Sequence, residues 1–218
     1  MSKILEPIDD LLEQHELTHG NLCPGTLLAV RMVVLGCALV GIEDPRGADQ
    51  NRLIVWVEID RWLADAVESV AGARLGKRTL KFLDYGKLAA TFLNVDTGKA
   101  VRVVALESSR DLADQRHPEI ADKYERQMRT YREAAEEELF EVTDVEVQVR
   151  EKDLPGHPRS RVICARCGEG VSDGREIKLP DRITLCRPCV YGTYYQPPQR
   201  AFERVWNERT ETVSVGIQ

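Results

Sequence analysis

The sequence predicts an α+β fold, in which a core built on a mixed or antiparallel sheet with helices precedes a small metal-binding module. The predicted strands and helices follow one another without the regular alternation of a doubly wound sheet. Two of the strands are joined by residues 96–98 (Asp-Thr-Gly), a short turn typical of an antiparallel hairpin. Near the C-terminal end, two Cys-x-x-Cys pairs predict the module.

Apolar spacing and start and stop residues predict helices over 3–17, 26–40, 60–72 and 117–139. The segment 26–40 is apolar on nearly every side, which indicates a central buried helix that ends at Gly41. Asp60 is a preferred N-cap residue, so we expect it to start the third helix. The fourth helix is long and charged and is expected to act as a connector.

Runs rich in β-branched and other apolar residues predict five strands, over 52–58, 79–83, 88–95, 100–106 and 140–149. Residues 153–158 contain two prolines and a glycine, which predicts a linker. The expected organisation is a core with its long connecting helix over 1–152, a four-cysteine zinc module over 159–195 and a polar tail over 196–218.

The charge balance argues against a protein devoted to nucleic acid. Acidic residues number 36 and basic residues 30, for a net charge of −6, whereas nucleic-acid binding usually needs a basic face. Residues 159–189 differ, with seven basic and four acidic side chains. No apolar run approaches the roughly 18 residues that span a bilayer, and the N-terminus lacks a signal-peptide pattern. A cytoplasmic protein without membrane contact is expected.

The four cysteines Cys164, Cys167, Cys186 and Cys189 predict a structural zinc site. Their two Cys-x-x-Cys pairs are separated by 18 residues, within the spacing usual for tetrahedral zinc sites. Four thiolates leave no open coordination position, so the zinc is expected to be structural rather than catalytic. A rubredoxin-like iron site and paired redox dithiols are the alternatives.

His19 and Cys23 form a second candidate site, in front of the predicted central helix. Pro24 suits the first helical position, which makes Cys23 the predicted N-cap, where free N–H groups favour a thiolate. His19 is a candidate metal ligand, base or hydrogen-bond partner for that thiol. An inert, buried cysteine is the competing interpretation. Cys37 lies on the apolar helix and is predicted to be core.

Three stretches of the sequence together resemble the FmdE family of formylmethanofuran dehydrogenase proteins. His19–Gly25 reads H-G-N-L-C-P-G, similar to the family's H-G-H-L-C-P-G. Gly76-Lys77, residues 82–87 (F-L-D-Y-G-K) and Thr91-Phe92 resemble its G-K…F-x-D-Y-G-K…T-F. The paired cysteine turns complete the likeness, which runs from about residue 8 to 192. The resemblance implies an α+β core, a helical connector, a treble-clef-like zinc module and a dimer.

The resemblance also implies a core pocket with a second metal, held in this chain by His19 and Cys23. Two further motif positions, Asn21 and Trp62, depart from the family, which has a histidine and a cysteine there. A second family cysteine corresponds to Ala73. The motif residues Asp84, Tyr85 and Lys87 are expected to line the pocket; without the resemblance they would be an ordinary turn.

The function implied by the resemblance is that of a metal-binding accessory protein, serving the assembly, cofactor handling or regulation of a molybdenum- or tungsten-dependent partner enzyme. One alternative is an enzyme that uses Cys23 with His19 as a nucleophile or as a catalytic metal site. Another is a regulator whose zinc module binds protein or nucleic acid.

A homodimer is expected to pack partly through the connecting helix. Its apolar residues exceed what a solvated connector needs: Ile120, Tyr124, Met128, Tyr131, Leu139 and Phe140.

Overall fold

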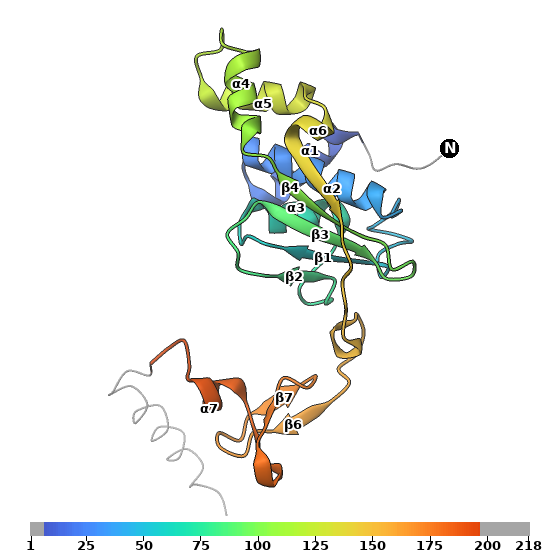
Figure 1. Cartoon of the computed structure of the whole chain (residues 1–218), viewed down its shortest axis with the longest axis vertical. Helices are drawn as coiled ribbons and strands as arrows, with labels where there is room; N and C mark the ends of the chain where they lie inside the picture. The colour runs from blue at the N-terminus through green and yellow to red at the C-terminus, as the bar shows by residue number, and fades with distance from the viewer. Residues whose placement is uncertain (1–6, 197–218) are drawn as a thin grey trace, which may run out of the picture. The chain divides into compact units, whose positions relative to one another are not determined.

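The chain, seen in a computed structural model, is described over residues 7–196 and divides into two compact units, residues 1–156 and 157–218 (Figure 1). The expected tail lies outside the described residues, except for Gln196. In the part of the chain that is described, no helix combines the length and the apolar character needed to cross a bilayer.

The first unit is built on a five-stranded sheet in the order β2-β1-β3-β4-β5. The strands are β1 (Leu53–Val57), β2 (Leu80–Phe82), β3 (Ala89–Asn94), β4 (Ala100–Ala105) and β5 (Phe140–Asp144). Strands β1 and β2 are parallel, and every other neighbouring pair is antiparallel. The predicted α+β fold with a mixed sheet is therefore confirmed. The last strand ends at Asp144 instead of residue 149.

The sheet buries one face against the helices, as the alternation of its side chains requires. Phe92 lies opposite Val55 on one side and Val101 on the other, and all three are almost fully buried. The residues one step along, Thr91 and Arg102, point to the other face and are only half-buried.

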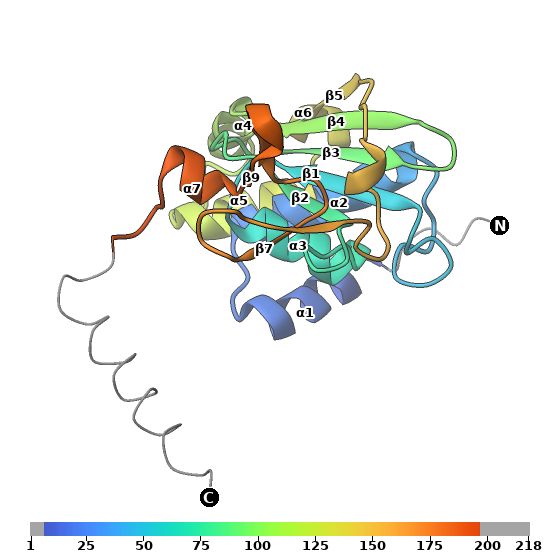
Figure 2. The same ribbon diagram turned by 90° about the horizontal axis from the view of Figure 1, so that it is seen from below.

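Three helices cover the buried face of the sheet: α1 (Ile8–His19), α2 (Pro24–Leu39) and α3 (Trp62–Ala71). Figure 2 shows α1 as the outermost, and it packs on α3 and α2. Helix α2 is central because it is buried on most sides, as predicted. At Gly36 the helix meets the sheet closely, since an added Cβ there would lie 2.3 Å from the Phe92 ring. The predicted N-cap of α3 is wrong: Arg61, not Asp60, occupies that position.

The predicted long connecting helix is wrong, because three shorter helices replace it: α4 (Ser108–Arg116), α5 (Lys123–Glu133) and α6 (Glu136–Leu139). Helix α4 was not expected at all. A fresh helix starts at Asp122, whose carboxylate accepts the N–H of Glu125 at 2.8 Å as an N-cap. The break after α5 has a buried cause. The Arg31 guanidinium on α2 binds the Ala134 carbonyl at 2.9 Å and the Glu136 carboxylate at 2.6 Å.

This rearrangement removes most of the apolar surface on which the dimer interface was predicted. Tyr131, Leu139 and Phe140 are at most 3% exposed and belong to the core of their own chain. Of the six apolar residues assigned to that surface, only Tyr124 is strongly exposed, at 65%.

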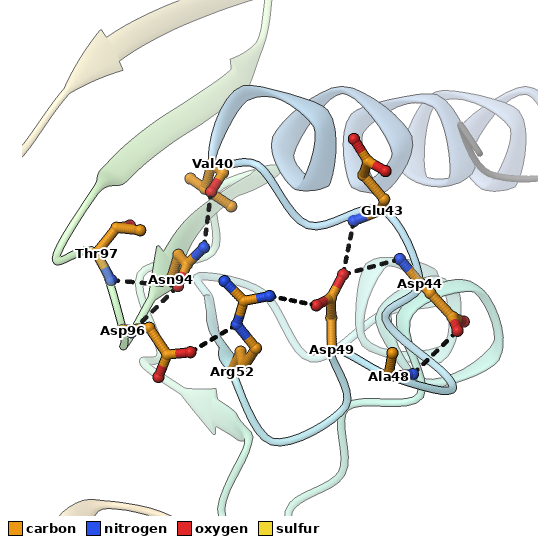
Figure 3. A network of polar contacts seen from close by, with 9 residues as sticks. All are labelled: Val40, Glu43, Asp44, Ala48, Asp49, Arg52, Asn94, Asp96 and Thr97. Carbon is orange, nitrogen blue, oxygen red and sulfur yellow. Dashed lines mark hydrogen bonds and ion pairs between the residues drawn. The ribbon is translucent and has the colours of Figure 1, made fainter. Parts of the chain in front are cut away.

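The loop between α2 and β1 is fixed by a polar network rather than by apolar packing (Figure 3). The Asp49 carboxylate accepts the backbone N–H groups of Glu43 and Asp44 at 2.9 and 3.0 Å. These bonds, that of Asp44 first, hold the pKa of Asp49 below its usual value. Arg52 then links Asp49 to Asp96 in the β3–β4 hairpin, at 2.6 Å to each carboxylate.

The second unit has little secondary structure. Its elements are β6 (Arg161–Ile163), β7 (Gly170–Ser172), β8 (Ile177–Lys178), a 3-10 turn (Pro180–Arg182), β9 (Thr184–Leu185) and α7 (Arg187–Tyr191). Strands β6 and β7 form one hairpin and β8 and β9 another. Another 3-10 turn, Glu151–Asp153, lies before this unit within the predicted linker region.

Candidate metal centre and core cavities

The second unit brings its four cysteines together. One ligand atom from each of Cys164, Cys167, Cys186 and Cys189 can be chosen so that all four lie within 4.8 Å of one another. The Sγ atoms of Cys167 and Cys186 are 3.7 Å apart. A tetrahedral zinc with bonds of about 2.3 Å to sulfur would place its ligands about 3.8 Å apart. The predicted cluster is confirmed as a group that can hold a metal ion.

Two local structures aim these thiols at one point. Cys164 follows β6, and the turn after it closes with the Gly168 N–H bonded to the Cys164 carbonyl at 3.0 Å. Gly168 has a φ of +75°, which glycine adopts without strain. The second pair stands at the start of α7, with Cys186 as its N-cap. The Cys186 N–H donates to the Cys164 sulfur at 3.3 Å, which joins the two pairs.

The electrostatics of the cluster favour a cation. Backbone N–H groups, first that of Cys167 and then that of Cys186, lower the pKa of Cys164 to about 6. Hydrogen bonding with Cys186 raises the pKa of Cys189 to about 12, since its neighbours already carry negative charge. Four adjacent thiolates form together only when a positive ion neutralises them. The donor set therefore fits a thiolate-bound metal.

His19, the first candidate ligand of the core, is already paired. It is the last residue of α1, and its Nδ1 lies 2.9 Å from the Asp65 carboxylate on α3. Its ring stacks on that of His15 at 5.1 Å between centroids. His15 is fully buried and bonds Ser69 at 2.9 Å, so α1 and α3 are joined by two parallel polar contacts.

The sequence analysis missed His15, Asp65 and Ser69, although each pair repeats with a helical spacing of four. Two histidines at positions i and i+4 on one helix face two polar residues at i and i+4 on the next. The sequence carried this signal, but it did not show that the two helices are neighbours.

Cys23 stands where it was predicted, at the N-cap of α2 with Pro24 behind it. The Thr26 hydroxyl accepts the Cys23 N–H at 2.8 Å and donates to the Cys23 carbonyl at 2.7 Å, which fixes the first turn of the helix. Cys37 is fully buried, and burial raises the pKa of its thiol to about 12. The predicted difference in environment between the two thiols is present.

The structure does not bring His19 and Cys23 to one cavity. His19 lines a cavity of about 500 Å³ and Cys23 another of about 280 Å³. Trp62 lines both, and its ring packs so tightly on Gly25 that an added Cβ would lie 2.6 Å away. The tryptophan that stands at a family cysteine position therefore fills the space between the two candidate ligands. Ala73, at the other cysteine position, is 2% exposed in the core.

The remaining motif residues lie on the surface. Asn21 is exposed after α1. The turn after β2 is held by its backbone, because the N–H groups of Tyr85 and Lys87 both donate to the Glu58 carbonyl, at 3.2 and 3.1 Å. Asp84, Tyr85 and Lys87 are themselves exposed, and none lines the cavities of His19 or Cys23. Their part in a pocket stays a prediction.

Fold and cluster together define a two-part protein, an α+β core with a four-cysteine metal-binding unit. Residues 18–149 match the family described as FmdE, Molybdenum formylmethanofuran dehydrogenase operon. Because the match covers more than half of the chain, the chain belongs to the FmdE family.

Two relatives are informative. A probable S-adenosyl-L-methionine-binding protein of Archaeoglobus fulgidus is 30% identical over 216 residues, covering 89% of this chain and 56% of that protein. The chain thus spans about half the length of this curated relative. An FmdE-like protein of the tungsten formylmethanofuran dehydrogenase, from Syntrophus aciditrophicus, has a similar structure. Its TM-score is 0.56 at 23% identity, covering 87% of this chain and 95% of that one. This second likeness concerns the fold.

Proposed function

We propose that the chain is a metal-binding accessory protein that serves a molybdenum- or tungsten-dependent enzyme of the formylmethanofuran dehydrogenase system. The observation that carries the proposal is the four-cysteine cluster, in a chain whose family match names such an operon. Assembly, cofactor handling and regulation are the roles that suit a protein with a closed metal centre, since such a centre has no open position for a substrate.

The metal of the cluster is proposed to be structural zinc. Four sulfur ligands in tetrahedral proximity suit zinc, and the unit has too little apolar interior to fold without it. A hairpin turn supplies one cysteine pair and the first turn of α7 the other, which supports the treble-clef-like arrangement.

Elemental analysis of three purified proteins tests the metal assignment. We expect one zinc per chain in the wild type, one in Cys23→Ala and none in Cys164→Ser. Iron in the wild type would replace zinc by a rubredoxin-like site. A second metal lost in Cys23→Ala would restore the core metal site implied by the resemblance.

Association measurements test the accessory role. The wild type, mixed with a purified molybdenum or tungsten formylmethanofuran dehydrogenase, is expected to sediment with it. Cys164→Ser should bind more weakly if the metal-stapled unit makes the contact. Absence of any association or effect on metal loading would contradict the accessory role and leave the metal assignment standing.

An enzyme is the second candidate, favoured by the position of Cys23 at a helix start beside a cavity. A nucleophilic thiol there would be assisted by helix N–H groups. His19 is not placed to act as its base, because it pairs with Asp65 and lines a different cavity. Incubation with acyl thioesters followed by mass spectrometry tests this candidate: a covalent adduct on Cys23 supports it.

A homodimer is also proposed, on the family resemblance and on the exposed edge of the sheet. Strand β2 is an edge strand, and Phe82 and the following Leu83 are 42% and 41% exposed there. Light scattering should give about twice the 24.6 kDa mass of one chain. A monomer mass at micromolar concentration would contradict the proposal.

A further inference from the structure

We propose that the cavity at the start of α2 binds a small anion through a carboxylate or phosphate group, and not the metal ion that the family resemblance implies there. This inference concerns the core and does not rest on the four-cysteine centre.

The charges around the cavity favour an anion. Two cationic side chains line its space of about 280 Å³, Arg110 and Lys123, and no carboxylate does. Glu107 pairs with Arg110 at 3.3 Å from outside the lining, with 85% of its side chain exposed. A surface pair of this kind is weak and leaves the guanidinium available to a second anion.

The first turns of two helices also meet at this cavity. Cys23, Pro24 and Gly25 contribute the start of α2. Lys123 and Tyr124 contribute the start of α5. Helix starts carry partial positive charge and N–H groups without helical partners. Since Pro24 has no N–H, the first such donor of α2 is that of Gly25.

Buried polar groups in the lining provide the independent sign of a ligand. The indole N–H of Trp62 is buried and, within residues 7–196, has no hydrogen-bond partner. Gln127 also lines the cavity and is only 9% exposed, and no side chain or backbone group in this part of the chain bonds its amide. Leaving such groups without a partner is costly, so they usually face a ligand or water.

The same residues disfavour a metal ion. Cys23 is the only thiol in the lining, and no histidine or carboxylate joins it. His19 is held by Asp65 in a separate cavity. Two cations beside a lone sulfur repel a divalent metal, whereas an oxyanion finds both charge and N–H donors.

Titrations of the full-length, ¹⁵N-labelled protein followed by NMR test the proposal. Inorganic phosphate and acetate are added separately, with chloride keeping the ionic strength constant. We expect saturable shifts of the Trp62 indole and Gln127 amide signals, assigned with Trp62→Phe and Gln127→Leu. The anion that saturates at the lower concentration identifies phosphate or carboxylate as the preferred group.

Matched variants separate a built site from general charge. Lys123→Gln and Gln127→Leu should each weaken binding about tenfold, as expected for a lost bond to a charged group. Lys87→Gln removes an exposed cation outside the cavity and should leave binding unchanged. If Gln127→Leu fails to fold, Gln127→Glu takes its place and should abolish binding by repulsion.

Three results would overturn the proposal: no saturable shift with either anion, equal binding by wild type and Gln127→Leu, or shifts produced by Zn²⁺ instead. Zinc content measured in the same samples reports on the four-cysteine centre, so its failure would be distinguished from failure of the anion site.

Discussion

The two units of the chain are stabilised in different ways. The first has a continuous apolar core, in which residues from α2, α3 and the sheet are almost completely buried. In the second, over residues 157–196, no aliphatic or aromatic side chain is buried; the buried residues are Cys164, Cys186 and Asp173. The interior of the second unit is therefore its cysteine cluster.

This difference means that the two units should respond to different perturbations. Burial of apolar surface stabilises the first unit, at roughly 25 cal/mol per Å². The second unit has almost none to bury, so the free energy of metal binding is its folding free energy. Removing the metal should affect one unit, and opening a cavity in the core should affect the other.

Loss of a metal ligand should have the largest effect. In Cys164→Ser, we expect the amide protons of residues 160–192 to lose their exchange protection, since the ligand set is incomplete. Exchange measured by mass spectrometry should leave the protection of α2 and the sheet unchanged. Cys23→Ser is the matched control and should retain both. Unchanged protection in the second unit of Cys164→Ser would mean that contacts other than metal bonds hold it together.

A core truncation should show the opposite pattern. Leu27 is fully buried in α2, so Leu27→Ala should lower the free energy of unfolding of the first unit by about 2–5 kcal/mol. Urea unfolding followed by circular dichroism measures it, and zinc content should stay at the wild-type value. Leu17→Ala, on the 84% exposed Leu17, is the control with little expected effect. Zinc loss in Leu27→Ala would show that the units depend on each other.

Close packing inside the core gives the next prediction. Because an added Cβ at Gly25 would lie 2.6 Å from the Trp62 ring, Gly25→Ala must displace a bulky, partly buried side chain. We expect a loss of about 1–3 kcal/mol, as for other overpacked cores. Trp62→Phe combined with Gly25→Ala should recover part of this loss. Additive losses in the double variant would mean that the clash is relieved elsewhere.

The two free thiols of the core should differ in alkylation rate. Cys23 is half-buried at a helix start, whereas Cys37 is fully buried with a pKa of about 12. Iodoacetamide at neutral pH should therefore modify Cys23 first, as read by peptide mapping. Earlier labelling of Cys37 would contradict the assigned environments.

Much of the fold follows from local signals in the sequence. The hairpin at residues 96–98, the apolar run of α2 and the paired cysteines each act over a short stretch, and the structure has them where they were expected. The N-cap at Cys23 was equally local, because Pro24 marks the helix start.

The features that were missed depend on contacts between distant residues. The charged helix was predicted too long because its second break depends on Arg31, about 100 residues earlier in the chain. Its first break did have a local signal, the Asp122 cap with Glu125 three residues later. Likewise, nothing in the sequence near His19 shows that Asp65 will bind it or that Trp62 will separate it from Cys23.

The smallest effect expected is a pH dependence confined to the first unit. His15 is fully buried, and burial lowers its pKa below 6.5, with the neighbouring His19 adding to the shift and Asp65 opposing it. Below pH 6.5 the unfolded chain takes up a proton that the folded chain resists, so the free energy of unfolding should fall as the pH drops through that value. Replacing His15 by Leu removes this contribution, and the stability of His15→Leu should fall less between pH 7 and 5.5. Urea unfolding at several pH values measures it, with His157→Gln as the exposed control. A steeper pH dependence in His15→Leu would mean that His15 is charged when folded, and that the contact between α1 and α3 is ionic.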